Sequence, residues 1–296
     1  MVQSTFCNDE LMIKLGFHLS IAGSVANASR IAIENGYGDF QIFTSNPMAW
    51  ANAAIPERSR HEFINLNNKH SITPFAHIPY LCNIASANDA VYAKSKAMLV
   101  DNLKNCMALE IKCLVIHLGS HLGKGVEYGT NRICDALSFA LDRTSGVDIL
   151  LENTSGYTNS IGSKLSEIGA IINRLDSDRL GVCFDTCHAF AAGYELRTEQ
   201  SVTALEEEFN SCIGAKKLML VHLNDAKFDL GSRRDRHWHI GEGCIGRAGF
   251  INLFRNELFN HGFFVLETPG SVMGDAEERN LAEIKRIIKA ATGNQL

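Results

Sequence analysis

The chain has 296 residues, of which 46% are hydrophobic and 21% are charged, and its longest apolar runs are too short to cross a membrane. This composition excludes a disordered or membrane-spanning protein and predicts a soluble globular protein with a large buried core. The formal net charge of −5 argues, when taken alone, against a nucleic-acid partner.

The nine cysteines are an odd number and form no CxxC pair, so we expect free thiols and a cytoplasmic protein. The N-terminal segment holds Asp9 and Glu10 and no basic residue, which does not fit a signal peptide. Cys113 and Cys183 lie in apolar runs and are expected to pack in the core. For Cys187, four residues after Cys183, we favour packing over zinc binding as well.

Eight short, almost continuously apolar runs recur along the chain and are typical of strands that are buried on both faces. In chain order they cover residues 15–19, 40–44, 74–77, 114–117, 149–152, 181–185, 218–223 and 263–267. The stretches between them are amphipathic and predict helices over residues 24–34, 57–69, 86–109, 130–143, 163–175, 198–213, 246–259 and 275–290. Ser86 with Asp89, and Asp275 with Glu278, resemble capping signals at helix starts.

This alternation predicts the α/β class and, within it, a single-domain (β/α)8 TIM barrel. An open doubly wound sheet is the competing architecture. We favour the barrel because there are eight strand–helix units and no G-x-G-x-x-G motif follows the first strand. We expect the barrel to span residues 14–292, preceded by an extension over residues 1–13.

Ionisable side chains stand at the ends of six consecutive predicted strands, and in a barrel these ends share the face on which catalytic sites are built. A single histidine there is most often an ordinary polar residue. Three buried carboxylates beside three imidazoles, however, need cations to stabilise them. Imidazole and carboxylate together suit Zn²⁺, Mn²⁺ or Fe²⁺ better than Mg²⁺ or Ca²⁺. The six residues are His77, His117, Glu152, Asp185, His222 and Glu267.

The connection after the seventh strand adds further candidate ligands. Asp235 and His237 are two residues apart, so on extended backbone their side chains point to the same side. Together with His188 they would form another site with three ligands. An isolated Asp-x-His pair is more often part of a solvated loop, but the surrounding pattern reverses that preference. The resulting nine candidate ligands suit three metal ions if one carboxylate is shared.

Several motifs resemble those of the endonuclease IV family of apurinic/apyrimidinic (AP) endonucleases. The resemblance runs from about residue 14 to the C-terminal helix. It is carried by GVCFDTCH at 181–188, VHLNDAK at 221–227, GSRRDRH at 231–237, GEG at 241–243, LENT at 151–154, IHLGSHL at 116–122 and LET at 266–268.

The resemblance implies a TIM barrel that holds three zinc ions. One zinc would be bound by His77, His117 and Glu152, and Glu152 would bridge to a second zinc. That second ion would also be bound by Asp185, His222 and Glu267, and the third by His188, Asp235 and His237. A carboxylate-bridged pair of zinc ions generates a nucleophile at neutral pH, so little acid–base work is left for side chains. Glu152 and Glu267 are accordingly the predicted catalytic residues.

The implied reaction is hydrolysis of the phosphodiester 5′ to an abasic site in duplex DNA, with cleaning of blocked 3′ ends. Three Zn²⁺ ions would change the formal charge to about +1 and concentrate positive charge at the barrel mouth. The basic residues Lys227, Arg233, Arg234 and Arg236 lie in the adjoining segment. A protein that is acidic without its metal can thus present a cationic face to DNA. We expect a monomer that works in the cytoplasm at the nucleoid.

Other residues are expected to contact DNA or to support the ligands. Tyr80 and Leu81 resemble the family's intercalating pair, and Met48 stands where the family usually has an arginine that enters the duplex. Lys227 and Arg236 are expected to contact DNA. Three further residues are expected to serve the metal site indirectly, by fixing the ligands through hydrogen bonds: His18, Asn224 and Asp225.

Two other functions remain open at the level of sequence. A metal-dependent sugar isomerase or epimerase with the same barrel would need one or two ions and a base. The additional group of His188, Asp235 and His237 speaks against it. The second alternative is a DNA-lesion binder without catalysis. Nicking of abasic DNA that is sensitive to chelators, without action on a ketose, would separate the three functions.

Overall fold

The computed structural model describes residues 12–50, 54–270 and 274–293. Parallel strands form one eight-stranded sheet in the order β1-β10-β7-β6-β5-β4-β3-β2. The strands are β1 (Ile13–Phe17), β2 (Asp39–Phe43), β3 (Thr73–His77), β4 (Cys113–His117), β5 (Asp148–Glu152), β6 (Leu180–Asp185), β7 (Leu218–His222) and β10 (Gly262–Leu266). All eight predicted strands are therefore present, and each agrees with its predicted range to within two residues at either end.

The sheet closes into a barrel where β1 meets β2. His18, directly after β1, forms an isolated parallel bridge with Gln41 of β2. The backbone N–H of Leu19 donates to the carbonyl oxygen of Gln41 at 2.7 Å. This closure excludes the open doubly wound sheet and confirms the TIM barrel. Because β1 begins at Ile13, the barrel includes the last residue of the expected extension, of which residues 1–11 lie outside the described part.

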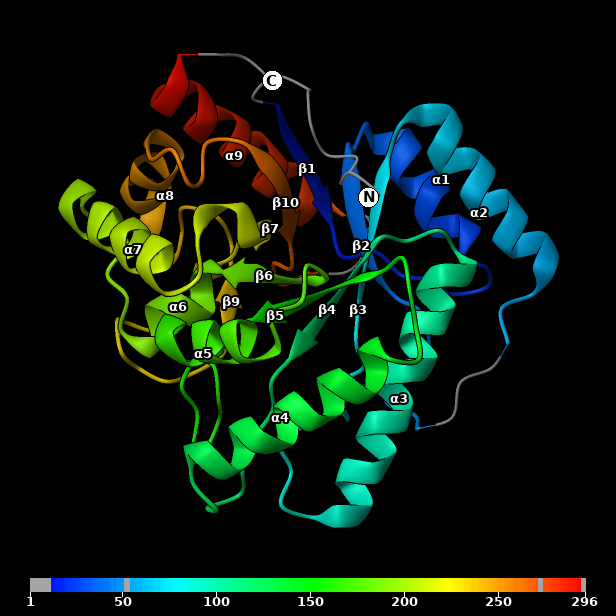
Figure 1. Cartoon of the computed structure of the whole chain (residues 1–296). Coiled ribbons are helices and arrows are strands. Elements are labelled where there is room, and N and C mark those ends of the chain that lie inside the picture. Colours follow the sequence, from blue (N-terminus) through cyan, green and yellow to red (C-terminus); the bar gives the residue numbers. More distant parts are fainter. Residues whose placement is uncertain (1–11, 51–53, 271–273, 294–296) are drawn as a thin grey trace.

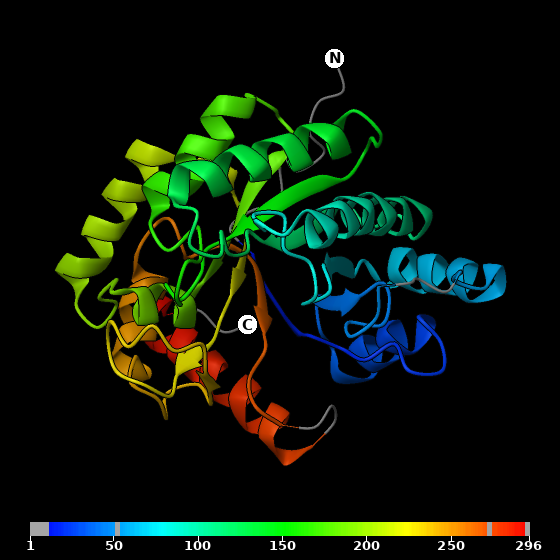
Figure 2. The ribbon, with the colours of Figure 1, turned by 90° about the horizontal axis from the view of Figure 1, so that it is seen from below.

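Helices alternate with the strands and surround the sheet (Figures 1 and 2). On α5, for example, Leu165, Ile168 and Ile172 form an apolar stripe at helical spacing that is buried. None of the helices in the described ranges is both long and apolar enough to span a bilayer. The helices are α1 (Ala26–Asn35), α2 (Glu57–His70), α3 (Asp89–Ala108), α4 (Val126–Leu141), α5 (Leu165–Leu175), α6 (Thr186–Ala192), α7 (Glu199–Cys212), α8 (Gly246–Arg255) and α9 (Asp275–Thr292), with a 3₁₀ turn over Ala215–Lys217.

Several local features differ from the sequence prediction. α4 begins four residues earlier than predicted, at Val126, and α8 ends four residues earlier than predicted, at Arg255. α3 begins at Asp89 and not at Ser86, because the side chain of Asn88 caps the helix by accepting from the N–H of Val91 at 3.1 Å. The short helix α6 follows β6 directly and was not predicted. The connection after β7 also contains an unpredicted antiparallel pair, β8 (Asp225–Ala226) with β9 (His237–Trp238).

The inside of the barrel is built in layers, because alternate residues of each strand point inward. The middle layer is an apolar plug. It consists of Phe75, Cys113, Val115, Leu150, Cys183, Leu220 and Val265. Two residues further along the same strands, the inward positions carry ionisable side chains, except that Cys113 is followed by Val115 of the plug before His117 is reached. The plug confirms the core placement of Cys113 and Cys183, and it is the floor on which the polar mouth rests.

Candidate metal centre

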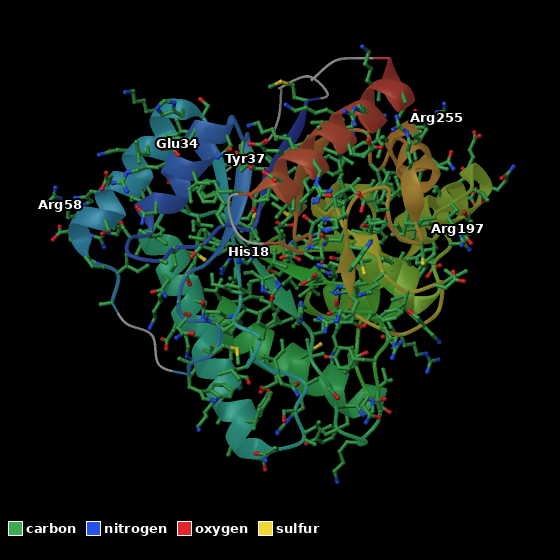
Figure 3. The ribbon with its side chains drawn as sticks, turned by 180° about the vertical axis from the view of Figure 1, so that it is seen from behind. His18, Glu34, Tyr37, Arg58, Arg197 and Arg255 are labelled. Atoms are coloured by element: carbon green, nitrogen blue, oxygen red, sulfur yellow. The ribbon has the colours of Figure 1, made fainter. Side chains whose placement is uncertain are left out.

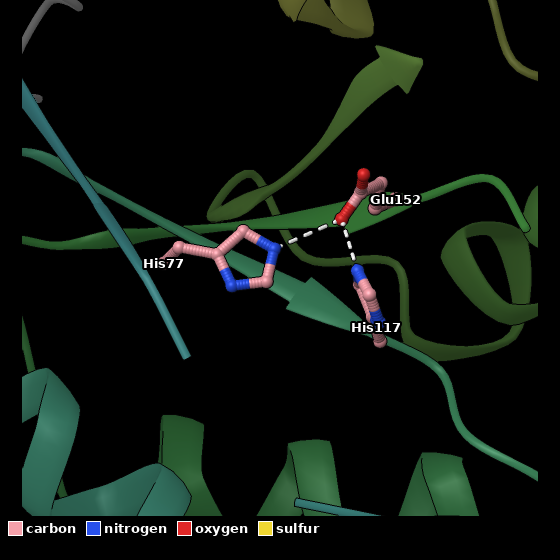
Figure 4. A group of neighbouring side chains, drawn as sticks. All are labelled: His77, His117 and Glu152. Carbon is pink, nitrogen blue, oxygen red and sulfur yellow. Dashed lines mark hydrogen bonds and ion pairs between the residues drawn. The ribbon is translucent and has the colours of Figure 1, made fainter. Parts of the chain in front are cut away.

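Glu152, at the end of β5, lies at the centre of the mouth, and its side chain is only 1% exposed. One of its carboxylate oxygens, Oε2, lies 3.0 Å from Nε2 of His77 and 2.9 Å from Nε2 of His117 (Figure 4). His77 ends β3 and His117 ends β4. Three neighbouring strands thus bring these residues into one group whose ligand atoms are close enough to share a metal ion.

The other oxygen of Glu152, Oε1, faces a different set of imidazoles. It lies 3.0 Å from Nδ1 of His222 and 3.4 Å from Nδ1 of His188. Burial works to raise the pKa of Glu152, but the neighbouring His117 and His222 hold that pKa well below its usual range. The carboxylate therefore remains ionised between two groups, which is the arrangement that a bridging ligand requires.

The second group joins Glu152 to Asp185, His222 and Glu267. Nδ1 of His222 lies 3.4 Å from Oε2 of Glu267 and 3.9 Å from Oδ2 of Asp185. Asp185 and His222 end their strands and are fully buried, whereas Glu267 stands one residue beyond β10 and its side chain is 16% exposed. The group consequently opens toward solvent on the side of Glu267.

The third group lies beside the second. Nε2 of His188 is 3.1 Å from Oδ2 of Asp235, and Nε2 of His237 is 3.5 Å from Oδ1 of Asp235. These are the three residues that the sequence grouped together. The set whose ligand atoms all lie close enough to share one ion, however, is Asp185, His188 and His237, with Asp185 in place of Asp235. Oδ2 of Asp185 lies 3.5 Å from Nε2 of His237, whereas Asp235 lies at the edge of the set with a side chain that is 48% exposed. Asp185 therefore stands between the second and third groups, much as Glu152 stands between the first and second.

Most imidazoles of the mouth are oriented by the backbone. In each case Nδ1 lies within hydrogen-bond distance of a backbone carbonyl oxygen, which accepts its proton and leaves Nε2 free to face the carboxylates. The Nδ1–O distances are 2.7, 3.0 and 3.1 Å for His77, His188 and His237, respectively. Such bonds fix the ring and its tautomer before any ion arrives.

Side-chain amides hold the carboxylates. Nδ2 of Asn224 donates to Oδ2 of Asp185 at 2.8 Å, and Oδ1 of Asn224 accepts the N–H of Glu267 at 2.8 Å. Asn153, which the sequence analysis did not single out, accepts the N–H of Asp185 at 2.7 Å. Asp225, in contrast, accepts backbone N–H groups of residues 226, 241, 243, 245 and 246. Its carboxylate thus pins the loop behind the site.

The residues of the mouth fit zinc. The donor set is imidazole and carboxylate, which zinc accepts in tetrahedral sites. Nε2 of His237 is buried and has no hydrogen-bond partner, although it points toward Asp185 and Asp235. A buried nitrogen of this kind is costly unless a ligand satisfies it. None of the three groups found within the described residues contains a cysteine, in agreement with packing of Cys183 and Cys187.

His18 lies near the centre of the molecule, whereas Arg58 and Arg255 lie on the outer helices (Figure 3). Nδ1 of His18 is 3.2 Å from Oε1 of Glu267, which places His18 beside the ligands as predicted. A cavity of about 190 Å³ opens at this point and is lined by His18, Tyr80 and Glu267, among others. It gives solvent a route to the second group.

The predicted DNA-contacting residues lie on loops around the mouth. Tyr80 is 62% exposed, and its ring centroid is 6.1 Å from that of His77 and 6.2 Å from that of His117. Leu81 beside it is half-buried, whereas Met48, on the loop after β2, is 71% exposed. Lys227 and Arg236 are both exposed, and Nζ of Lys227 lies over the ring of Trp238.

Comparisons with known proteins place the chain in a family. The model of a family described as xylose isomerase-like TIM barrel matches residues 29–291. A protein named "Probable endonuclease 4" from Methanoculleus marisnigri is 40% identical over 283 residues, which cover 94% of this chain and 100% of that protein. The chain belongs to the endonuclease IV family. This confirms the resemblance carried by the sequence motifs.

Solved structures agree with the family assignment. Endonuclease IV from Thermus thermophilus superposes with a TM-score of 0.82 at 31% identity, over 93% of this chain and 99% of that one. A D-tagatose 3-epimerase-like protein superposes with a TM-score of 0.73 at 21% identity, over 95% and 98% of the two chains. At that identity the second likeness shows the barrel fold alone, as expected for a scaffold that hosts several chemistries.

Proposed function

We propose that this member of the endonuclease IV family is a zinc-dependent AP endonuclease. It hydrolyses the phosphodiester 5′ to an abasic site in duplex DNA and leaves a 3′-hydroxyl and a 5′-deoxyribose phosphate. The observation that carries the proposal is the buried carboxylate of Glu152, with His77 and His117 on one oxygen and His222 on the other. One carboxylate divided in this way suits a pair of cations.

Three ions would occupy the three groups of the mouth. His77, His117 and Glu152 would hold the first. Bound zinc supplies positive charge for phosphate oxygens and lowers the pKa of water enough for attack at neutral pH. Glu152 would be shared with the second ion, which Asp185, His222 and Glu267 would also hold. The third ion would be held by His188, Asp235 and His237.

Glu267 is the ligand best placed to act on the reacting water. Burial works to raise its pKa, but His222 and His18 hold that pKa well below the usual range, so the carboxylate is ionised at neutral pH. Its backbone N–H is fixed by Asn224, and its side chain borders the cavity at the mouth. Glu267 therefore orients the attacking water by accepting a hydrogen bond from it.

The loops around the mouth would bind the DNA. Lys227 and Arg236 supply positive charge for backbone phosphates, which sets affinity without reading sequence. Tyr80, and Met48 with its exposed side chain, are apolar groups available to fill the gap left by a nucleotide taken out of the stack. Because all nine candidate ligands belong to one chain, a monomer suffices.

We also propose that the same groups remove blocking phosphates from 3′ ends, since both reactions are an attack of water on phosphorus. The eight cysteines of the described part are free thiols, which agrees with work in a reducing cytoplasm, beside the nucleoid where the substrate lies.

An incision assay on a duplex with one reduced abasic site tests the reaction. A reduced site cannot undergo β-elimination, so cleavage 5′ to it requires hydrolysis. We expect cleavage that yields an end a polymerase can extend, that stops with a chelator and that returns with zinc. Cleavage of only the unreduced site, on its 3′ side, would refute hydrolysis, because that chemistry needs an amine.

The same experiment separates the alternatives. A sugar epimerase would leave the duplex intact and convert a ketose, and a lesion binder would shift the duplex in a gel without nicking it. The third group, His188 with Asp235 and His237, favours the nuclease, since an epimerase needs one or two ions and a base.

A further inference from the structure

Gln41 is a polar residue in an apolar environment. It occupies the middle of β2, is fully buried and stands in register with Phe75 of the apolar plug. A buried primary amide is costly unless its oxygen and its NH₂ group both find partners. The hydrogen-bond partners of Gln41 therefore indicate what this residue does.

All of these partners belong to the mouth above. Oε1 of Gln41 lies 2.8 Å from Nε2 of His222. Nε2 of Gln41 donates to Oε1 of Glu267 at 2.8 Å and lies 2.9 Å from Nδ1 of His18. One amide thus reaches from β2 to two candidate ligands of the second metal group, on β7 and directly after β10.

The carboxylate fixes which way the amide points. If the amide were flipped, its oxygen would face Oε1 of Glu267, and two acceptors would meet where Nε2 of Gln41 now donates at 2.8 Å. With the NH₂ group committed to Glu267, the oxygen must face His222. An oxygen accepts only, so Nε2 of His222 carries the proton, and Nδ1 keeps its lone pair.

Nδ1 is also the nitrogen of His222 that faces Glu152, at 3.0 Å, and Glu267, at 3.4 Å. His222 differs in this respect from His77, His188 and His237, which are held through Nδ1 by backbone carbonyls. The orientation of His222 depends on a side chain, which can be removed by substitution, and not on the backbone.

We propose that Gln41 is a positioning residue that sets the tautomer of His222 and the orientation of Glu267, and thereby prepares the second zinc site. The inference rests on the proposed function, because it assumes that the second group binds zinc. Residues that orient ligands in this way typically contribute about 10- to 100-fold to metal affinity.

The test compares Gln41→Met with Phe75→Leu in the zinc-loaded full chain. Methionine has a similar length and fits an apolar layer, but it removes the bonds to His222 and Glu267. Phe75→Leu alters the packing at the same depth and removes no hydrogen bond. Zinc is titrated out with a competing chelator while the number of ions retained per chain is measured.

We expect Gln41→Met to release one ion of the set about 10- to 100-fold more readily than wild type, with Phe75→Leu behaving as wild type. Equal retention by wild type and Gln41→Met would overturn the role of Gln41 and leave the proposed function standing. A wild-type protein that binds no zinc would overturn both.

A second measurement does not depend on any variant. Long-range ¹H–¹⁵N correlation spectra of the zinc-loaded wild type report which nitrogen of each imidazole is protonated. We expect His222 to carry its proton on Nε2, and His77 and His188 to carry theirs on Nδ1. A proton on Nδ1 of His222 would contradict the proposal even if Gln41→Met failed to fold.

Discussion

Two of the carboxylates that face the inside of this barrel, Asp39 and Glu152, are almost completely buried, and their pKa values shift in opposite directions. Asp39, at the start of β2, accepts the N–H of Phe264 at 3.1 Å, and burial raises its pKa well above the usual range despite that bond and the nearby Lys14. Glu152, at the end of β5, is equally buried, but His117 and His222 hold its pKa well below the usual range.

The difference shows that burial alone does not determine the charge of a carboxylate. At the end of the barrel opposite the mouth, where the strands begin, the neighbours of Asp39 are mostly backbone and apolar groups, so the neutral acid is favoured. At the mouth a ring of imidazoles surrounds Glu152, and the charged form is favoured. A metal ion can replace the protons that those imidazoles would otherwise carry, so the mouth is suited to a cation.

The largest effect is expected from Glu152→Gln. The amide keeps the shape of the side chain but loses the charge that two ions would share. We expect incision of abasic DNA to fall by more than about 100-fold, since residues that merely orient metal ligands already contribute about 10- to 100-fold. Zinc content per chain should fall with it. Full activity with full zinc would show that Glu152 does not bridge.

Leu150→Ala is the matched control. Leu150 precedes Glu152 by two residues, points to the same side of β5 and belongs to the apolar plug. Its truncation should lower the free energy of unfolding by about 2–5 kcal/mol, measured with urea, and leave the zinc content unchanged. A loss of zinc equal to that of Glu152→Gln would mean that plug and mouth are not separable layers.

Gly16→Ala tests the packing at the end of the barrel opposite the mouth. A Cβ on Gly16 would lie 1.8 Å from the carbonyl oxygen of Asp39, so β1 and β2 would have to move apart. We expect the free energy of unfolding to fall by about 1–3 kcal/mol or more, as for other overpacked cores. Thermal unfolding measures this change. A melting temperature equal to that of wild type would show that β1 and β2 can move apart without loss of stability.

Asp39→Asn tests the raised pKa through pH dependence. A raised pKa in the folded state means that folding takes up a proton, so stability is lost as pH rises from the unfolded value, about 3.9, through the folded one. The variant lacks this loss. Its free energy of unfolding relative to wild type should therefore increase with pH across that window. A difference independent of pH would contradict the role assigned to burial.

Met48→Arg should have the smallest effect, because it adds one charge on an exposed loop at the rim of the mouth. If Met48 reaches the DNA, binding to an abasic duplex becomes tighter, and the slope of log affinity against log salt steepens by about 0.9. Unchanged affinity and slope would show that residue 48 does not contact the duplex.

The sequence predicts the fold well because barrel strands carry their own signal. Each is a short apolar run buried on both faces, and the run itself locates the strand. Helix α6 was missed for a local reason. The side chain of Asp185 caps it by accepting the N–H of His188 at 2.7 Å, so the helix begins directly at the strand end. Nothing in the sequence separates the two elements.

The candidate ligands were predictable because they stand at strand ends, which a barrel brings together. The residues that hold the ligands in position were harder to predict from the sequence. Asn224 lies beside the motif residues, and the structure places it between Asp185 and Glu267. Gln41 reaches β7 from β2, and such a contact depends on how the strands stagger around the barrel. The available signal was one polar residue within the apolar run Phe40–Phe43.

Elemental analysis of the purified wild-type protein tests the central claim, namely that the polar mouth of the barrel is a zinc site. The sample must also be shown to incise abasic DNA, so that metal content and activity refer to the same molecules. The account predicts about three zinc ions per chain, at three or four ligands for each ion. One zinc ion or none in a fully active sample would contradict it.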